Sequence, residues 1–222
     1  MTAPVHGIYL HGFASGPQTA KGTALGRRLL AAGAVRSWTI PDLEGADFAV
    51  LTMDRWLDRA EAAIAALPDD GAPCLLVGSS LGGWGAAVLA ARAPARLAGA
   101  LLIAPAFGFT ERWPDRLGAA AMARWRSEGR LPFFHYGQQR EIALGVAFLD
   151  SCAAVPAWPA APGCRCAIIH GRSDDTVPWT ASLDWARGHA QVELHLVRGD
   201  HRLTEPRHEA LIAHAALDLI GA

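Results

Sequence analysis

The stretch Cys74-Leu75-Leu76-Val77-Gly78-Ser79-Ser80-Leu81-Gly82-Gly83-Trp84-Gly85 decides the fold. Its first residues are a short apolar run that predicts a buried strand, and the Ala-rich segment 84–92 predicts a helix. Between the two, Gly78 and Gly82 lie two residues on either side of Ser80 in the pattern Gly-x-Ser-x-Gly. A strand, a tight turn and a helix in this order are the context in which that pattern forms a nucleophile elbow.

Ser80 is the residue of this stretch that we predict to be a nucleophile. A serine at the apex of such a turn adopts an unfavourable backbone conformation, which projects its Oγ clear of the sheet. The Leu81 N–H at the start of the helix could then stabilise an oxyanion. One alternative is an ordinary glycine-rich turn. Another is Ser79 as nucleophile, but Ser79 lacks glycines at both two-residue offsets.

Composition limits the possible functions. A chain of 222 residues with 51% hydrophobic and 18% charged residues can form one α/β domain with a substantial core. The net charge of −1 provides no attraction for nucleic acid or an anionic membrane, so neither is expected as a partner. The four cysteines lack zinc-site spacing, which predicts free thiols, no metal and a reducing compartment. With no targeting segment or membrane-spanning run, a cytoplasmic protein is expected.

Predicted strands alternate with predicted helices along most of the chain. The strands cover residues 5–10, 38–40, 74–77, 97–104, 166–170 and 192–197, and the helices cover 19–32, 52–67, 84–92, 179–189 and 205–220. This alternation predicts a doubly wound, mostly parallel sheet with helices on both faces. The irregular span of about 106–162, with helices predicted at 116–128 and 138–150, is interpreted as a small helical cap inserted into a single domain that covers 1–222.

An acidic loop follows the predicted strand 166–170. It carries Asp174 and Asp175, either of which could accept the Nδ1–H of a histidine and stabilise the imidazolium. The carboxyl edge of a parallel sheet is where α/β proteins place their sites. A solvated turn is the equally weighted alternative, because Ser-Asp-Asp forms turns on its own.

A histidine follows the last predicted strand. His201 comes after Gly-Asp in a loop from which its imidazole could reach Ser80 across the sheet edge. The other histidines lie in predicted strands, helices or the insertion, and His170 is expected to anchor the acidic loop. A serine, an acid and a histidine in this chain order form one of the known triad orders.

The loop His11-Gly12-Phe13 follows the first predicted strand. The Phe13 N–H could supply a second oxyanion donor and complete a two-amide hole with Leu81. Gly12 would allow the close approach that this role needs. His11 is expected to brace the loop rather than to act as a general base.

With these stretches in place, the chain resembles the α/β-hydrolase superfamily over nearly its whole length. Segments 76–84, 170–179 and 200–202 are similar to those of small cap-bearing carboxylesterases and acyl-protein thioesterases of the abhydrolase-domain group. The segment 11–17, His-Gly-Phe-Ala-Ser-Gly-Pro, instead resembles bacterial esterases of the YqiA kind. The resemblance therefore implies an α/β-hydrolase fold.

The resemblance also implies a role for each matching residue. Ser80 would be the nucleophile, Asp174 the acid and His201 the base. In motifs of the form His-Gly-x-x-Asp-x-x-Val-Pro the acid is the fifth residue, which selects Asp174 over Asp175.

The implied activity is hydrolysis of carboxylic esters or thioesters through an acyl-enzyme, without a metal or an organic cofactor. The expected partner is a small-molecule ester or thioester with an apolar acyl group, since the aromatic-rich segment 107–158 could wall a pocket over Ser80. Core packing of those aromatic residues is an equal alternative. A non-catalytic binding protein, acyl transfer, and peptide or carbon–carbon bond hydrolysis remain alternative functions.

Overall fold

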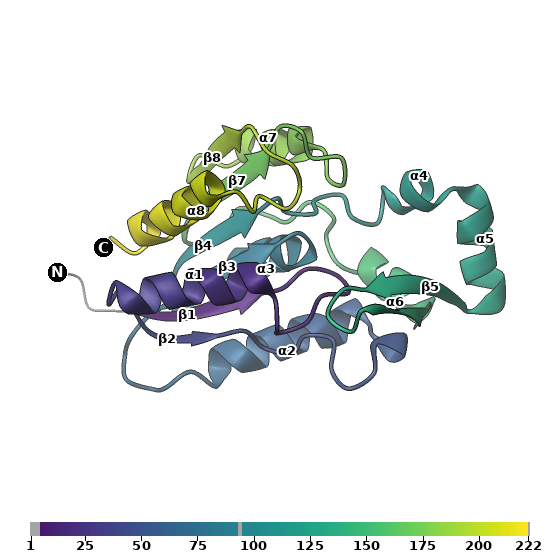
Figure 1. Cartoon of the computed structure of the whole chain (residues 1–222), viewed down its shortest axis with the longest axis horizontal. Coiled ribbons are helices and arrows are strands. Elements are labelled where there is room, and N and C mark those ends of the chain that lie inside the picture. Colours follow the sequence, from purple (N-terminus) through teal and green to yellow (C-terminus); the bar gives the residue numbers. More distant parts are fainter. Residues whose placement is uncertain (1–4, 93–94, 222) are drawn as a thin grey trace.

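A six-stranded parallel sheet forms the centre of the molecule (Figure 1). The computed structural model describes residues 5–92 and 95–221. The strand order is β2-β1-β3-β4-β7-β8, and each neighbouring pair is parallel. These strands are β1 (Val5–Leu10), β2 (Val35–Thr39), β3 (Cys74–Ser79), β4 (Leu97–Ile103), β7 (Arg165–Gly171) and β8 (Val192–Val197). The order reverses beside β1, so β1 and β3 meet at the point where α/β proteins form a crevice.

Helices cover both faces of this sheet, as the alternating pattern predicted. One face packs against α1 (Ala20–Ala31) and α8 (Pro206–Leu219). The other face packs against α2 (Met53–Ala65), α3 (Leu81–Ala91) and α7 (Trp179–Arg187). The predicted doubly wound α/β fold is confirmed.

Strand β3 shows why its sequence is a continuous apolar run. Leu75 and Val77 belong to the core beneath α1 and α8, whereas Cys74 and Leu76 belong to the core beneath α2 and α3. Successive side chains of a strand point to opposite faces, and here both faces are buried. The run therefore holds the strand at the centre of the sheet.

A segment inserted between β4 and β7 extends beyond one end of the sheet (Figure 1). It contains α4 (Trp113–Leu117), α5 (Ala119–Glu128), the antiparallel strands β5 (Arg130–His135) and β6 (Arg140–Gly145), and α6 (Ala147–Ala153). The helix predicted at 138–150 is therefore wrong over its first half. Residues 140–145 favour a helix locally, but pairing with β5 and burial of Leu144 override that preference.

All four cysteines are free thiols, as their spacing predicted, and Cys74, Cys152 and Cys166 are buried. Within residues 5–92 and 95–221, no helix is both long enough and apolar enough to cross a membrane.

Candidate active site

Ser80 lies at the sharp turn between β3 and α3. Its φ of 56° and ψ of −116° are unusual for a residue with a Cβ atom. The surrounding structure holds this strained conformation, because the Ser80 N–H donates to the Ile103 carbonyl at 2.9 Å. The flanking glycines are required sterically. A Cβ on Gly78 would collide with the Gly82 carbonyl, and a Cβ on Gly82 would collide with the Leu10 carbonyl.

Three predicted site residues come together at the carboxyl edge of the sheet. His201 Nε2 lies 3.0 Å from Ser80 Oγ, and His201 Nδ1 lies 2.7 Å from Asp174 Oδ2. Because the carboxylate can only accept, Nδ1–H donates to it and Nε2 is left to accept the serine proton. The His201 side chain is 20% exposed, whereas the Asp174 side chain is 0% exposed. Ser80 and the imidazole are thus partly exposed to solvent, whereas the carboxylate that bonds the imidazole is buried.

Asp174 is held as a carboxylate by hydrogen bonds. Burial opposes its ionisation, yet hydrogen bonds from His170, His201 and Val177 lower the pKa of Asp174 below its ordinary value. His170 Nε2 lies 3.0 Å from Asp174 Oδ2, and the Val177 N–H donates to Oδ1 at 2.7 Å. His170 therefore anchors the acidic loop, as expected. Asp175 is exposed, and its carboxylate bonds the Thr176 hydroxyl rather than His201.

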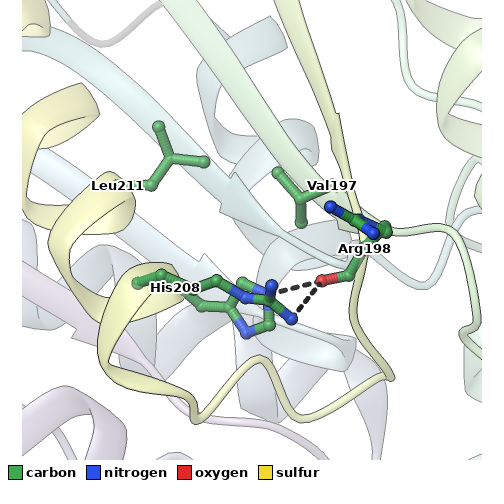
Figure 2. Close-up of a pocket in the computed structure, with 5 residues that line it drawn as sticks. Val197, Arg198, His208 and Leu211 are labelled. Atoms are coloured by element: carbon green, nitrogen blue, oxygen red, sulfur yellow. Dashed lines mark hydrogen bonds between the residues drawn. The ribbon is translucent and has the colours of Figure 1, made fainter.

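The loop that carries His201 is fixed from the side of α8 (Figure 2). His208 Nε2 donates to the Arg198 carbonyl at 2.7 Å, beside a pocket lined by Val197, Arg198, Arg207, His208 and Leu211. Gly199 packs so closely on the His208 ring that a Cβ there would lie 2.7 Å from it. Asp200 Oδ1 accepts the Leu203 N–H at 3.1 Å and closes the turn around His201. These contacts hold the loop, and with it the His201 imidazole, at a defined position above the sheet edge.

The loop after β1 passes next to Ser80. A Cβ placed on Gly12 would lie 3.5 Å from Ser80 Cβ, so this loop borders the elbow directly. In the part of the chain that the structure describes, neither the Phe13 N–H nor the Leu81 N–H donates to an acceptor. Both amides remain predicted oxyanion donors. His11 is fully buried, burial lowers its pKa, and its Nδ1 accepts the Gly16 N–H at 3.1 Å, which fits a bracing role.

Aromatic rings join the loop after β1 to the inserted segment. The Phe13 ring centre lies 5.4 to 6.3 Å from the centres of five other rings, namely Phe48, Phe109, Trp113, Phe133 and Phe148. Trp113 and Phe148 are buried, whereas Phe13 and Phe109 are partly exposed. Most of the cluster is thus packed core, and its partly exposed members form its surface.

Two polar contacts fasten the β5–β6 hairpin to the sheet domain. The Tyr136 N–H donates to the Ala14 carbonyl at 2.7 Å. His135 Nε2 and Glu44 Oε2 lie 2.7 Å apart, and both side chains are 4% exposed. The Glu44 Oε1 also accepts the Ser15 N–H at 3.3 Å. The hairpin therefore contacts the same loop that carries Phe13.

Sequence reasoning missed Lys21, which lies beneath the elbow. Its Nζ donates to Ser79 Oγ at 3.3 Å. Composition carried a signal, since Lys21 is the only lysine among 20 basic residues. The His201 imidazole lies within hydrogen-bond distance of Ser80 Oγ, whereas the Ser79 hydroxyl accepts from Lys21, so the geometry favours Ser80 as the partner of the imidazole. Within residues 5–92 and 95–221, no group of three or more His, Cys, Asp and Glu side chains could hold a metal ion.

The doubly wound sheet, the strained elbow and the Ser80–His201–Asp174 contacts define a member of the α/β-hydrolase superfamily. This agrees with the resemblance seen in the sequence. The chain belongs to UPF0227, an uncharacterised protein family whose model matches residues 6–214. No curated protein matches the sequence.

Solved structures share this fold over the whole chain. A candidate hydrolase from Agrobacterium vitis S4 is 27% identical, with a TM-score of 0.82 over 98% of this chain and 88% of that one. Mouse alpha/beta hydrolase domain-containing protein 10 is 23% identical, with a TM-score of 0.81 over 100% and 92% of the two chains. Est1E from Butyrivibrio proteoclasticus is 19% identical, with a TM-score of 0.74 over 100% and 90%. The last two likenesses establish the fold alone.

Proposed function

We propose that this protein is a serine hydrolase that cleaves carboxylic esters or thioesters through an acyl-enzyme intermediate. The observation that carries the proposal is the hydrogen-bonded chain from Ser80 through His201 to the buried Asp174. A serine hydroxyl is a weak nucleophile unless a positioned base removes its proton.

In the acylation step, His201 Nε2 takes the Ser80 proton while Oγ attacks the carbonyl carbon of the substrate. Asp174 keeps the Nδ1–H tautomer and stabilises the imidazolium that forms. The Phe13 and Leu81 amides, whose N–H groups have no acceptor in the described residues, bind the tetrahedral oxyanion. His201 then returns the proton to the leaving alcohol or thiol.

Deacylation repeats these roles with water as the nucleophile. His201 accepts a proton from the water as it attacks the acyl-enzyme, and Ser80 leaves with that proton. The exposed fraction of the His201 side chain allows the water to reach the imidazole. No step requires a metal or an organic cofactor.

The proposed substrate carries an apolar acyl or aryl group. Phe109 stacks on Trp84 with ring centres 5.7 Å apart and follows Ala106, whose N–H donates to the Ser80 carbonyl at 3.0 Å. Phe13 and Phe109, both partly exposed, thus provide apolar surface near the nucleophile. One structural neighbour, Est1E, was solved with ferulic acid bound, and others are described as lipolytic enzymes. We also propose that residues of about 106–162 act as a cap within a single domain of residues 1–222.

The test is hydrolysis of p-nitrophenyl esters and acyl thioesters, from acetyl to palmitoyl, by the wild type, Ser80→Ala and Ser79→Ala. We expect Ser80→Ala to lose at least about 10³-fold in kcat. Ser79→Ala should stay within about tenfold of the wild type, because the Ser79 hydroxyl bonds Lys21 and not the imidazole of His201. The preferred acyl length would measure the space beside Ser80.

Three results would contradict the proposal. Hydrolysis that survives Ser80→Ala moves the nucleophile to another residue. A folded wild type that cleaves no substrate, and in which a fluorophosphonate probe leaves Ser80 unlabelled, supports a non-catalytic binding protein. Products formed by transfer to an added alcohol or amine would instead indicate acyl transfer on the same triad.

A further inference from the structure

Lys21 is the only lysine in the chain, and every other Lys or Arg position is an arginine. It lies in the first turn of α1 and is only partly exposed. Its Nζ donates to Ser79 Oγ at 3.3 Å, and Ser79 directly precedes the predicted nucleophile. Among the described residues Lys21 forms no ion pair, so an ammonium group with three donors makes one hydrogen bond.

Several charged groups face Lys21 from neighbouring elements. Asp200 and Arg202 lie in the loop that carries His201, Asp174 lies in the acidic loop, and Glu209 lies on α8. The Tyr9 hydroxyl on β1 also bonds Ser79, but burial raises the Tyr9 pKa, so Tyr9 stays neutral. The ammonium therefore bonds the residue before the predicted nucleophile, while Asp174 and Asp200 attract it and Arg202 repels it.

The pKa of Lys21 shows that this position is unfavourable for a charge. Burial lowers the Lys21 pKa from 10.5 to about 8, against the attraction of Asp200 and Asp174. Between these two pH values the unfolded chain holds a proton that the folded chain has lost, so stability rises with pH there. At neutral pH the protein thus carries a largely buried charge on Lys21, which lowers its stability. If the side chain served only the stability of the fold, an apolar side chain of similar length would give a more stable protein than lysine.

We propose that Lys21 is a positioning residue whose ammonium group holds the elbow through Ser79 and attracts the acid and base loops toward the elbow through Asp174 and Asp200. The inference rests on the proposed hydrolase function. Ser79 and Ser80 share a peptide bond, so a bond to Ser79 Oγ restrains the strained turn next to the predicted nucleophile.

The experiment compares the wild type with Lys21→Met, Lys21→Arg and a matched control, Arg27→Met. Arg27 is exposed on the same helix, so its replacement removes one positive charge away from the elbow. For each protein, kcat and KM for a p-nitrophenyl ester are measured from pH 6 to 10, together with the melting temperature at pH 7.

We expect the wild-type kcat to fall as the pH rises through about 8, the pKa of Lys21. Lys21→Met should lower kcat about tenfold at pH 7 with little change in KM, and should lose that alkaline fall. Lys21→Arg should keep its charge and move the fall to higher pH. The melting temperature of Lys21→Met should equal or exceed that of the wild type, and Arg27→Met should match the wild type in activity.

Each contrary result has its own meaning. Lys21→Met with the kcat and pH profile of the wild type overturns the positioning role alone. A melting temperature that drops together with kcat also overturns it, because Lys21 would then be a structural residue. A wild type without activity overturns the proposed hydrolase function, and this inference with it.

Discussion

Asp174 and Asp175 are chemically identical neighbours with opposite surroundings. The Asp174 carboxylate is fully buried and contacts His201 at 2.7 Å, whereas Asp175 is exposed. Hydrogen bonds, not intrinsic acidity, therefore determine which of the two can orient the imidazole. The pair offers an internal comparison in which only the position of the carboxylate differs.

Asp174→Asn should lower kcat about 10³–10⁴-fold, because an amide cannot stabilise the imidazolium and can turn His201 to the wrong tautomer. Asp175→Asn should leave kcat within about twofold, since surface changes away from a site have small effects. Steady-state ester hydrolysis by the two variants at pH 7 measures both values. Equal losses in the two variants, or a loss confined to Asp175→Asn, would contradict Asp174 as the acid.

At the junction of β3 with α3, the elbow depends on backbone atoms that pass close to one another. Gly82 packs on the Leu10 carbonyl of β1, so a methyl group there forces β1 and α3 apart. Gly82→Ala should therefore lower the free energy of unfolding by at least about 3 kcal/mol or prevent folding. Urea denaturation followed by circular dichroism measures this change.

Gly188→Ala is the matched control for that substitution. Gly188 follows α7 with a φ of −81°, and an added Cβ would meet its nearest atom at an ordinary 3.6 Å. We expect this variant to be unchanged or up to about 1 kcal/mol more stable, because alanine restricts the unfolded chain. A Gly82→Ala variant as stable as Gly188→Ala would show that the elbow is looser than described.

The elements that were predicted well are those whose signals are local. The apolar run of β3 was predicted from residues next to one another in the chain. The loops after β3, β7 and β8 pointed to Ser80, Asp174 and His201 in the same way, and the structure brings these three side chains into hydrogen-bond contact. The β5–β6 hairpin was missed because its pairing depends on Leu144 packing under Trp125, whose Nε1 donates to the Leu144 carbonyl at 2.9 Å. Local propensity contains no information about such contacts.

The polar residues that support the site were missed for the same reason. Glu44 and His135 are 91 residues apart in the chain, and Lys21 and Ser79 are 58 apart. No pattern in one sequence reports which distant side chains will meet. The rarity of lysine was a signal that the sequence analysis did not use, and only the fold shows which side chains Lys21 meets.

For the molecule as a whole, the burial of the four cysteines reports how closely the sheet, the helices and the inserted segment pack together. Cys74, Cys152 and Cys166 are buried in β3, α6 and β7, and burial raises the pKa of Cys74 to about 12. Cys164 is half-buried. The thiolate is the reactive form of cysteine. Burial therefore slows the reaction of these three thiols twice, because it blocks the reagent and lowers the fraction of thiolate.

A chromogenic disulfide reagent should therefore label at most one thiol per native chain, and Cys164→Ser should remove that labelling. Four thiols should react in denaturant. Fast reaction of a second native thiol would contradict the packing, and reaction of Cys152 in particular would show that the inserted segment opens in solution.

The hydrogen bond from the Tyr136 N–H to the Ala14 carbonyl ties the inserted segment to the loop after β1, so neither can move without the other. Residues 11–16 and the β5–β6 turn lie more than a hundred positions apart in the chain, yet each forms part of the other's boundary. A chimera that received only the inserted segment of a relative would keep its own loop after β1, and the two surfaces would no longer fit each other. Recombination between relatives should therefore succeed where both pieces are exchanged together, and evolution would be expected to have changed them as a pair.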